Sequence, residues 1–457
     1  MGIPNWAHFV GIGGAGMSAI AQILLESGYK VSGSDLKTSD VTKRLQRYGA
    51  TIYKGHSKDN VREGVEGVVI STAIPLDNVE VKEAYQRGIP VIKRAEMLGR
   101  LMKLQKGIAV AGAHGKTTTT SMISLLLEKG GFDPTVVVGG EVNDIGSNAK
   151  KGEGEYLVAE ADESDGSFLL LEPFIVVVTN VEDDHLENYG TIREIQNAFK
   201  KFIRKVPQEG KIVLCNDDSF LKTLVNDFKN NVVTYGLEHP ADFMAKDVTV
   251  NNGGTSAKVF YKEQYLGELK LSVPGKHNIS NALAAIAVGH GLGLSFQEMA
   301  EILKSFRGVK RRFQLIGEKS GIKIIDDYAH HPTEIKATLK AASETHNGRI
   351  IAVFQPHRYS RTKQLYREFG EAFEDADQVI ITSIYSAGEK EIPGVSAEKI
   401  AQIAREKKPG KKVLYLPDTN SILNYLHENV QSQDMIITLG AGDIWKVGVL
   451  FAQKLGA

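Results

Sequence analysis

The sequence predicts an α/β protein of three domains, and three observations support this prediction. Its 457 residues exceed the length of one ordinary domain. Two glycine-rich loops, at residues 11–16 and 112–117, each stand between an apolar, strand-like run and a helix-like run, which is typical of parallel sheets that bind nucleotides. After residue 311, strand-like and helix-like runs continue to alternate. We expect the domains to cover residues 1–105, 106–310 and 311–457.

The composition narrows the class of protein. Lys plus Arg and Asp plus Glu both total 55, so the formal net charge is zero and gives no global attraction to nucleic acid or membrane. The single cysteine, Cys215, excludes an internal disulfide framework and suits a reducing compartment. No apolar run approaches the ~18 residues of a membrane span, and residues 1–8 lack the pattern of a signal peptide. We expect a cytoplasmic protein with no membrane insertion and no nucleic-acid partner.

The first domain carries a glycine loop of the dinucleotide-binding type. An apolar run at residues 8–12 opens into the loop at residues 11–16, G-I-G-G-A-G, and a helix-like run and a second strand lead to Asp35. Such a loop places a diphosphate at a helix N-terminus, with a carboxylate ~20 residues further on near a ribose or base. Helix and strand patterns alternate to residue 92, so we expect a Rossmann-like domain. The motif fits NAD and a UDP-sugar equally well.

The second glycine loop predicts an ATP site in a P-loop ATPase-like domain. A strand-like run at residues 108–111 breaks at Gly112, and Gly115-Lys116-Thr117 leads into a helix expected at residues 118–129. Free backbone N–H groups, the helix dipole and a Lys ammonium then surround one point, which suits a polyphosphate. The Thr117 hydroxyl is placed to complete the shell of a bound Mg²⁺. Val110 stands where the full motif has its first glycine.

Polar clusters follow the next two strands of the central domain. The strand at residues 156–161 ends in an acidic run that contains Glu160, and the strand at residues 174–179 runs into a cluster that ends at His185. Ligands gather at the carboxyl ends of parallel strands, so we expect both clusters at one sheet edge. Further on, short alternating segments around residues 251–254 predict a hairpin and a mixed sheet.

Two further polar pairs are candidates for ligand binding. Asn278 and Asn281 lie three residues apart at the start of an alanine-rich helix and would share one face; either could bond a base or phosphate, and helix capping is the alternative. In the third domain, which we expect to be Rossmann-like, Arg358 and Arg361 follow a strand at residues 350–354. Two guanidinium groups at a strand end suit the grip of a carboxylate.

Taken in order, the motifs of this chain resemble those of the Mur ligases, and in particular those that add L-alanine to UDP-N-acetylmuramate. The resemblance runs from His8 to Asp443. Any one motif is weak, whereas the ordered set is specific. The set comprises HFVGIGGAGMS, SGSD, GAHGKTTTTSM, EADESDGSF, TNVEDDHLENYG, GKHNISN, VKRRF, DDYAHHPTEI, FQPHRYSRT, YSAGE and LGAGDIW.

The resemblance implies an ATP-dependent ligase of peptidoglycan synthesis. ATP would phosphorylate the carboxylate of UDP-N-acetylmuramate to an acyl phosphate, and the amine of L-alanine would attack it and release phosphate. Such a reaction needs dense positive charge and a site without water. ATP with Mg²⁺ or Mn²⁺ would be required, and the protein would be a monomer or homodimer with only small-molecule substrates.

The resemblance also assigns roles to residues. It implies that Lys116, His185, Arg312 and Asp327 are catalytic, that Arg358 and Arg361 hold the alanine carboxylate, and that His330 and His331 lie nearby. The metal ligands would be Thr117, Glu160 and His185. The UDP-sugar would contact Gly13, Gly14, Ala15, Gly16, Met17, Ser34, Asp35 and Ser71. ATP would contact Gly112, Ala113, His114, Gly115, Lys116, Thr117, Thr118, Asn278, Asn281, Arg312 and Asp327.

Three other functions remain as alternatives at this point. A related ligase attaches a recycled murein tripeptide to the same sugar nucleotide and shares these loops. A nicotinamide-dependent oxidoreductase would explain the first glycine loop but would leave Lys116 and the third domain without a role. The third alternative is a regulator that has the same fold and binds nucleotides but catalyses no reaction.

Overall fold

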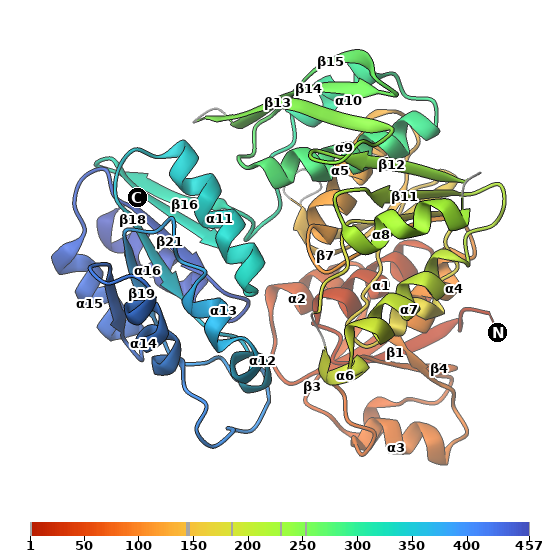
Figure 1. Ribbon diagram of the computed structural model, residues 1–457. Helices are drawn as coiled ribbons and strands as arrows, with labels where there is room; N and C mark the ends of the chain where they lie inside the picture. Colours follow the sequence, from red (N-terminus) through yellow and green to blue (C-terminus); the bar gives the residue numbers. More distant parts are fainter. Residues whose placement is uncertain (1, 143–146, 184–185, 229–230, 252–253, 457) are drawn as a thin grey trace. The chain divides into compact units, whose positions relative to one another are not determined.

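The computed structural model describes residues 2–142, 147–183, 186–228, 231–251 and 254–456. It contains two compact units, one of Met1–Lys246, Lys258–Glu268 and Ser280–Phe306, and the other of Asp247–Ala257, Leu269–Ile279 and Arg307–Ala457. Helices and strands alternate along most of the chain (Figure 1). Within the described ranges, no helix combines the length and the hydropathy needed to cross a membrane.

The N-terminal sheet has five parallel strands in the order β3-β2-β1-β4-β5. Successive strands therefore lie first on one side of β1 and then on the other, and this reversal leaves a crevice at the carboxyl end of β1, where such sheets bind ligands. The prediction of a Rossmann-like domain is confirmed. The elements are β1 (Trp6–Val10), α1 (Ala15–Glu26), β2 (Lys30–Asp35), α2 (Asp40–Arg47), β3 (Thr51–Lys54), β4 (Gly67–Ile70), α3 (Val79–Gln86), β5 (Val91–Lys93) and α4 (Arg94–Met102).

The central sheet is mixed, as predicted, and its strand order is β15-β14-β13-β12-β11-β10-β6-β9-β7-β8. β8 is antiparallel to β7, whereas β6 pairs in parallel with β9 and β10. The predicted hairpin turn includes residues 252–253, which lie outside the described residues. The strands are β6 (Lys106–Ala111), β7 (Thr135–Val142), β8 (Ser147–Lys150), β9 (Tyr156–Glu160), β10 (Ile175–Val178), β11 (Lys211–Cys215), β12 (Val232–Gly236), β13 (Phe243–Asn251), β14 (Gly254–Tyr261) and β15 (Gln264–Leu271).

The helices of the central segment connect these strands. α5 (Lys116–Lys129) follows β6 and is buried over most of its length, since nine of its fourteen residues are buried. α9 follows β15. The remaining helices are α6 (Leu186–Tyr189), α7 (Ile192–Ile203), α8 (Ser219–Leu224), α9 (Lys276–Gly291) and α10 (Phe296–Lys304).

The C-terminal sheet has the order β16-β17-β21-β18-β19-β20, and β16 is its antiparallel edge. Along the central strand β18, Ile350, Ala352 and Phe354 belong to one hydrophobic cluster and Ile351 and Val353 to another. Both faces of the sheet are therefore covered, as in doubly wound folds. The elements are β16 (Gln314–Lys319), β17 (Ile322–Asp327), α11 (Pro332–Thr345), β18 (Ile350–Phe354), α12 (Tyr359–Gln364), α13 (Tyr366–Gly370), β19 (Gln378–Ile381), α14 (Ala397–Lys407), β20 (Lys412–Tyr415), α15 (Thr419–Asn429), β21 (Met435–Leu439) and α16 (Trp445–Leu455).

Candidate active site

The phosphate loop turns sharply between β6 and α5. Gly112 and Gly115 have φ of +135° and +83°, a region that side chains with a Cβ rarely adopt. Gly115 is the N-cap, and the helix begins at Lys116, two residues before the predicted start at Thr118. Thr117 therefore lies in the first turn, where backbone N–H groups have no intrahelical acceptor and the helix dipole is positive.

The end of β10 fixes the shape of this loop. The Asn180 side chain accepts a hydrogen bond from the His114 N–H (2.8 Å) and donates one to the His114 carbonyl (3.1 Å). The Thr179 hydroxyl donates to the same carbonyl (2.6 Å). A Cβ on Gly112 would collide with that hydroxyl. The loop is thus held from the neighbouring strand, because the N–H groups of Ala113 and His114 both donate to Asn180.

The ammonium of Lys116 is enclosed by acceptors. It donates to the carbonyls of Gly112 and Ala113 and to Oε1 of Glu163 (2.8 Å). Glu163 is only 4% exposed. Burial alone would lower the pKa of Lys116, but the carboxylates of Glu163, Asp162 and Glu160 outweigh it and raise that pKa above its ordinary value. The Lys116 side chain is therefore a charged ammonium throughout the neutral range.

The carboxyl ends of three strands meet beside this charge. β6 lies between β10 and β9, with Val110 paired to Glu160 and Ala111 to Val178. The prediction that both polar clusters share one sheet edge is confirmed. The Glu160 carboxylate lies against the backbone of β7, because a Cβ on Gly139 would come within 2.5 Å of Oε2. The hydroxyl of Thr117 and the carboxylate of Glu160 are oxygen donors of the kind that Mg²⁺ prefers. His185 lies outside the described residues.

The two asparagines of α9 differ in their contacts. Asn281 is 7% exposed, accepts a hydrogen bond from Thr119 Oγ1 (3.2 Å), and has its Oδ1 2.6 Å from the position of a Cβ on Gly115. It therefore packs directly on the N-cap of α5. Asn278 donates to the Pro274 carbonyl (2.7 Å), which fastens the start of α9 to the turn before it.

The first glycine loop is built around the N-terminus of α1. The Gly13 N–H donates to Oδ2 of Asp35 (2.9 Å), and a Cβ on Gly13 would lie 2.8 Å from that oxygen. Gly14 is the N-cap and provides no side-chain hydrogen bond to the helix. β4 pairs with β1, so Ser71, which follows β4, lies at the same sheet edge. The loop, Asp35 and Ser71 thus lie at one edge of the first sheet, where the strand order reverses.

A buried polar cluster lies beneath Asp35. The hydroxyl of Ser34 is fully buried and donates to Oε2 of Glu80 (2.6 Å). Glu80 also accepts from Asn60 Nδ2 (2.6 Å) and lies 3.3 Å from Nδ1 of His56. Burial alone would raise the pKa of Glu80, but the contacts with His8, Ser34 and Asn60 outweigh it and lower that pKa to about 2. The hydrogen bond from Ser34 to Glu80 therefore anchors the end of β2, next to Asp35.

In the second unit, Asp327 lies at the end of β17 in a buried setting. Its carboxylate accepts from the backbone N–H groups of Phe313 (3.0 Å) and Ala329 (2.8 Å) and from Thr338 Oγ1 (3.1 Å). Burial raises the pKa of Asp327 to about 6, although Arg312 opposes the shift. The group consequently changes charge just below neutral pH.

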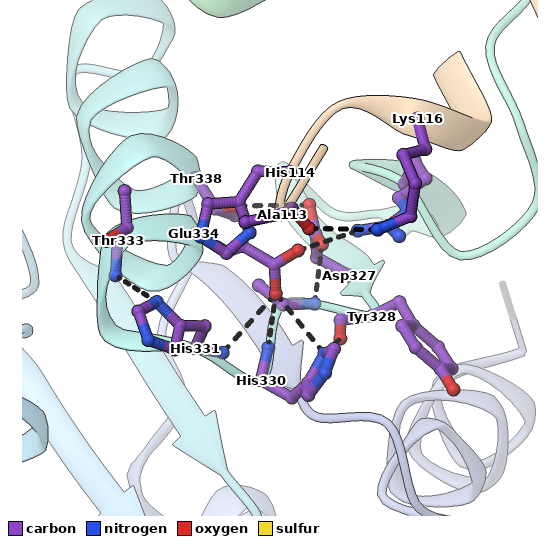
Figure 2. A network of polar contacts seen from close by, with 12 residues as sticks. Ala113, His114, Lys116, Asp327, Tyr328, His330, His331, Thr333, Glu334 and Thr338 are labelled. Atoms are coloured by element: carbon purple, nitrogen blue, oxygen red, sulfur yellow. Dashed lines mark hydrogen bonds and ion pairs between the residues drawn. The ribbon is translucent and has the colours of Figure 1, made fainter. Parts of the chain in front are cut away.

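Glu334 organises the start of α11 next to Asp327 (Figure 2). Its Oε2 accepts from the N–H groups of His330 (2.9 Å) and His331 (3.3 Å), and Oε1 lies 3.5 Å from Nη1 of Arg312. His331 is the N-cap and completes a capping box. The structure therefore brings Arg312, His330 and His331 together through one carboxylate.

Arg358 and Arg361 lie at the end of β18, as predicted. Arg358 is the N-cap of α12 with φ of +70°, and its N–H donates to the Tyr385 carbonyl (2.8 Å). His357 stacks on the Tyr385 ring at a centroid distance of 5.7 Å. Burial first, and then His330, Arg361 and Arg358, lower the pKa of His357 to about 3. The imidazole is therefore neutral, and the positive charge at this strand end comes from the two arginines.

Sequence reasoning missed four functional candidates that the structure reveals. Asn180 and Glu163 lie within quoted motifs, but only the fold shows which partner each meets. Arg311 donates to Asp326 (2.9 Å) and to the Gly440 carbonyl (2.7 Å), so it holds the last glycine turn. Tyr385 lies in the YSAGE motif and stacks on His357. Its aromatic side chain was the only feature of the sequence that could have suggested such a contact.

Comparisons with known proteins agree along the whole chain. Three family models match in order: Mur ligase family, catalytic domain, at residues 7–106; Mur ligase middle domain at residues 110–289; and Mur ligase, glutamate ligase domain, at residues 311–442. Two curated relatives are both UDP-N-acetylmuramate–L-alanine ligases. The one from Pelotomaculum thermopropionicum is 56% identical, and the one from Desulforamulus reducens 53%; each match covers 98% of this chain and 97% of the relative.

Solved structures give the same result. The UDP-N-acetylmuramate-alanine ligase of Thermotoga maritima has a TM-score of 0.84 and is 31% identical, with 98% of this chain and 99% of that chain covered. A murein peptide ligase of Psychrobacter arcticus, 24% identical with 99% of this chain and 98% of that chain covered, has a TM-score of 0.73 and shares the fold. The chain belongs to the Mur ligase family.

Proposed function

We propose that this chain is an ATP-dependent ligase that joins L-alanine to the carboxylate of UDP-N-acetylmuramate, the first amino-acid addition of peptidoglycan stem-peptide synthesis. The observation that carries the proposal is the enclosure of the Lys116 ammonium at the positive end of α5. The substrates are inferred from relatives of that printed name at 56% and 53% identity over nearly the full length. Domains at residues 1–105, 106–310 and 311–457 accord with the three matched segments.

ATP would bind at the phosphate loop. Residues 112–118 would surround the phosphates, with Lys116 offsetting charge on the β- and γ-phosphates and Asn278 and Asn281 contacting the nucleotide. Thr117, Glu160 and His185 would hold Mg²⁺, which would neutralise phosphate charge when bound. The oxygen donors of Thr117 and Glu160 fit this ion. In the proposed assignment, the protein acts in the cytoplasm.

UDP-N-acetylmuramate would bind at the first glycine loop. The N–H groups of residues 13–17 suit its diphosphate, and Asp35 and Ser71 would contact the uridine or ribose. Ser34 would act by supporting Asp35, because its own hydroxyl is committed to Glu80.

The chemistry then needs two steps. The substrate carboxylate oxygen attacks the γ-phosphorus, the bond to the β-phosphate oxygen breaks, and ADP leaves. The amine of L-alanine attacks the acyl carbon, loses a proton, and phosphate leaves with the electron pair of the broken C–O bond. Arg312 would stabilise the phosphoryl charge, Asp327 would accept hydrogen bonds or a proton, and Arg358 and Arg361 would hold the alanine carboxylate.

Phosphate release tests this proposal. With UDP-N-acetylmuramate and ATP, we expect release to depend on L-alanine and to be at least 100-fold slower with a murein tripeptide, the substrate of the alternative ligase. Lys116→Ala should lower kcat by several orders of magnitude. Lys129→Ala, at the exposed end of the same helix, should retain the rate. Near-normal turnover in Lys116→Ala, or a preference for the tripeptide, would refute the assignment.

A further inference from the structure

Arg94 lies directly over the first glycine loop, although no motif pointed to it. It is the first residue of α4, and its guanidinium covers Gly16 in the first turn of α1. A Cβ on Gly16 would lie 2.9 Å from Nη1 and 3.0 Å from Cδ of Arg94. A larger residue at position 16 would therefore displace this guanidinium.

Arg94 brings a positive charge to a helix N-terminus. A guanidinium beside a helix N-terminus meets the positive end of the helix dipole, which is unfavourable. The first turn of α1 contains no acidic residue, and its N-cap is glycine. Arg94 is itself at the N-terminus of α4. Cations are favoured at the opposite end of helices. The Asp162 carboxylate offsets part of this charge, and an anion bound between the two helix N-termini would offset more of it.

One carboxylate holds Arg94 in place. Nη2 of Arg94 donates to Oδ2 of Asp162 (3.1 Å), and the two side chains form an ion pair. The contact occupies Nη2 alone, whereas Nη1 faces Gly16. The two side chains are 24% and 43% exposed, so the guanidinium is open to a ligand.

We propose that Arg94 binds the diphosphate of the sugar nucleotide. Asp162 would hold the guanidinium of Arg94 over the glycine loop for this purpose. The proposal rests on the proposed function, which supplies the UDP-sugar. The N–H groups of α1 and the guanidinium would then contact the same phosphates from two sides. Arg94 is a substrate-binding residue, and Asp162 is a positioning residue that acts through it.

Calorimetric titration of the full chain tests the proposal with three probes: UDP-N-acetylmuramate, UDP, and uridine measured by competition. Arg94→Ala should weaken the affinities for UDP-N-acetylmuramate and for UDP equally, by about 10- to 100-fold. The affinity for uridine should stay within about threefold of the wild-type value. Arg100→Ala is the matched control, because Arg100 lies on the same helix and pairs with Glu96; its affinities should stay unchanged. In steady-state assays, Arg94→Ala should raise KM for the UDP-sugar and leave KM for ATP unchanged.

Each other outcome overturns the proposal in a recognisable way. Loss of UDP-N-acetylmuramate affinity with UDP unaffected would move Arg94 to the lactyl carboxylate. Equal loss for uridine would show a structural role, as would a parallel rise in KM for ATP. If Arg94→Ala does not fold, Arg94→Lys supplies the same comparison, since it keeps the charge and loses the planar fork. Failure of the wild-type chain to bind UDP would count against the proposed function itself, before any variant is compared.

Discussion

Replacement of Glu80 by Gln should make the stability of the first domain much less dependent on pH. Glu80 is fully buried, and its carboxylate accepts short hydrogen bonds from Ser34 Oγ and Asn60 Nδ2, both 2.6 Å. Burial alone would raise the pKa of Glu80, but the contact with His8 and these two donors favour the ionised form and lower that pKa to about 2. A glutamine amide keeps the shape, cannot ionise, and turns one acceptor into a donor.

The size of the effect follows from linkage between protonation and folding. The ordinary pKa of 4.5 and the folded value of about 2 differ by about 2.5, which corresponds to about 3 kcal/mol. Because the folded pKa is the lower one, this stability is fully present above pH 4.5 and is lost as the pH falls through 2. At pH 3 the same linkage leaves about 1.4 kcal/mol. The wild-type domain should thus lose about 2 kcal/mol from this group between pH 7 and pH 3.

Tryptophan fluorescence can report this domain alone. The chain has two tryptophans, and Trp6 lies in β1 with its indole N–H bonded to Ser32 Oγ (3.0 Å). In a Trp445→Phe background, urea unfolding at pH 7 and pH 3 would follow Trp6 for wild-type Glu80, Glu80→Gln and the control Glu63→Gln. Glu63 is exposed, so its variant should follow the wild type. Equal losses of unfolding free energy in wild type and Glu80→Gln between the two pH values would refute the reasoning.

Two further substitutions test the packing around the proposed ATP site and the C-terminal core. Gly115→Ala would place a Cβ 2.6 Å from Oδ1 of Asn281 at φ of +83°, a strain of roughly 1–2 kcal/mol, so KM for ATP should rise by about tenfold; an unchanged KM in the phosphate-release assay would contradict this. Phe354→Ala removes a fully buried ring that packs on Phe369 at 5.2 Å and Phe373 at 5.5 Å, and should cost about 3–5 kcal/mol. Urea unfolding followed by Trp445 in a Trp6→Phe background measures it, and a loss below about 1 kcal/mol would show that the cavity collapses.

The strands and helices that carry the glycine loops were predictable because their signals are local. An apolar run, a glycine with positive φ and a helix follow one another within about fifteen residues at each loop. β18 was predicted with its observed bounds, since it is a continuous apolar run covered on two faces. β16, β7 and β8 were not predicted. β16 is an edge strand whose residues are largely exposed, so it lacks the apolar pattern that marks a buried strand.

Contacts between distant residues were beyond the reach of sequence reasoning. His331 was proposed near the active site, and the structure adds that it caps α11. Residue type alone did not predict this capping role, because it depends on Glu334, three residues later, and on the backbone turn between them. In the same way, the burial that raises the pKa of Asp327 comes from elements remote in sequence. Residue type predicted the candidates, and the fold determines their charge states.

The acidic run after β9 shows most directly what the fold adds. As a sequence feature it was ambiguous, because acidic loops are usually just solvated. In the structure, two consecutive residues meet cations beside different glycine loops. Asp162 pairs with Arg94 of α4, over the first glycine loop, and Glu163 pairs with Lys116 of the phosphate loop. A phosphate bound at either loop would share its cation with one of these carboxylates. Because the two acids are adjacent at one strand end, they give the two glycine loops a physical connection that neither motif contains.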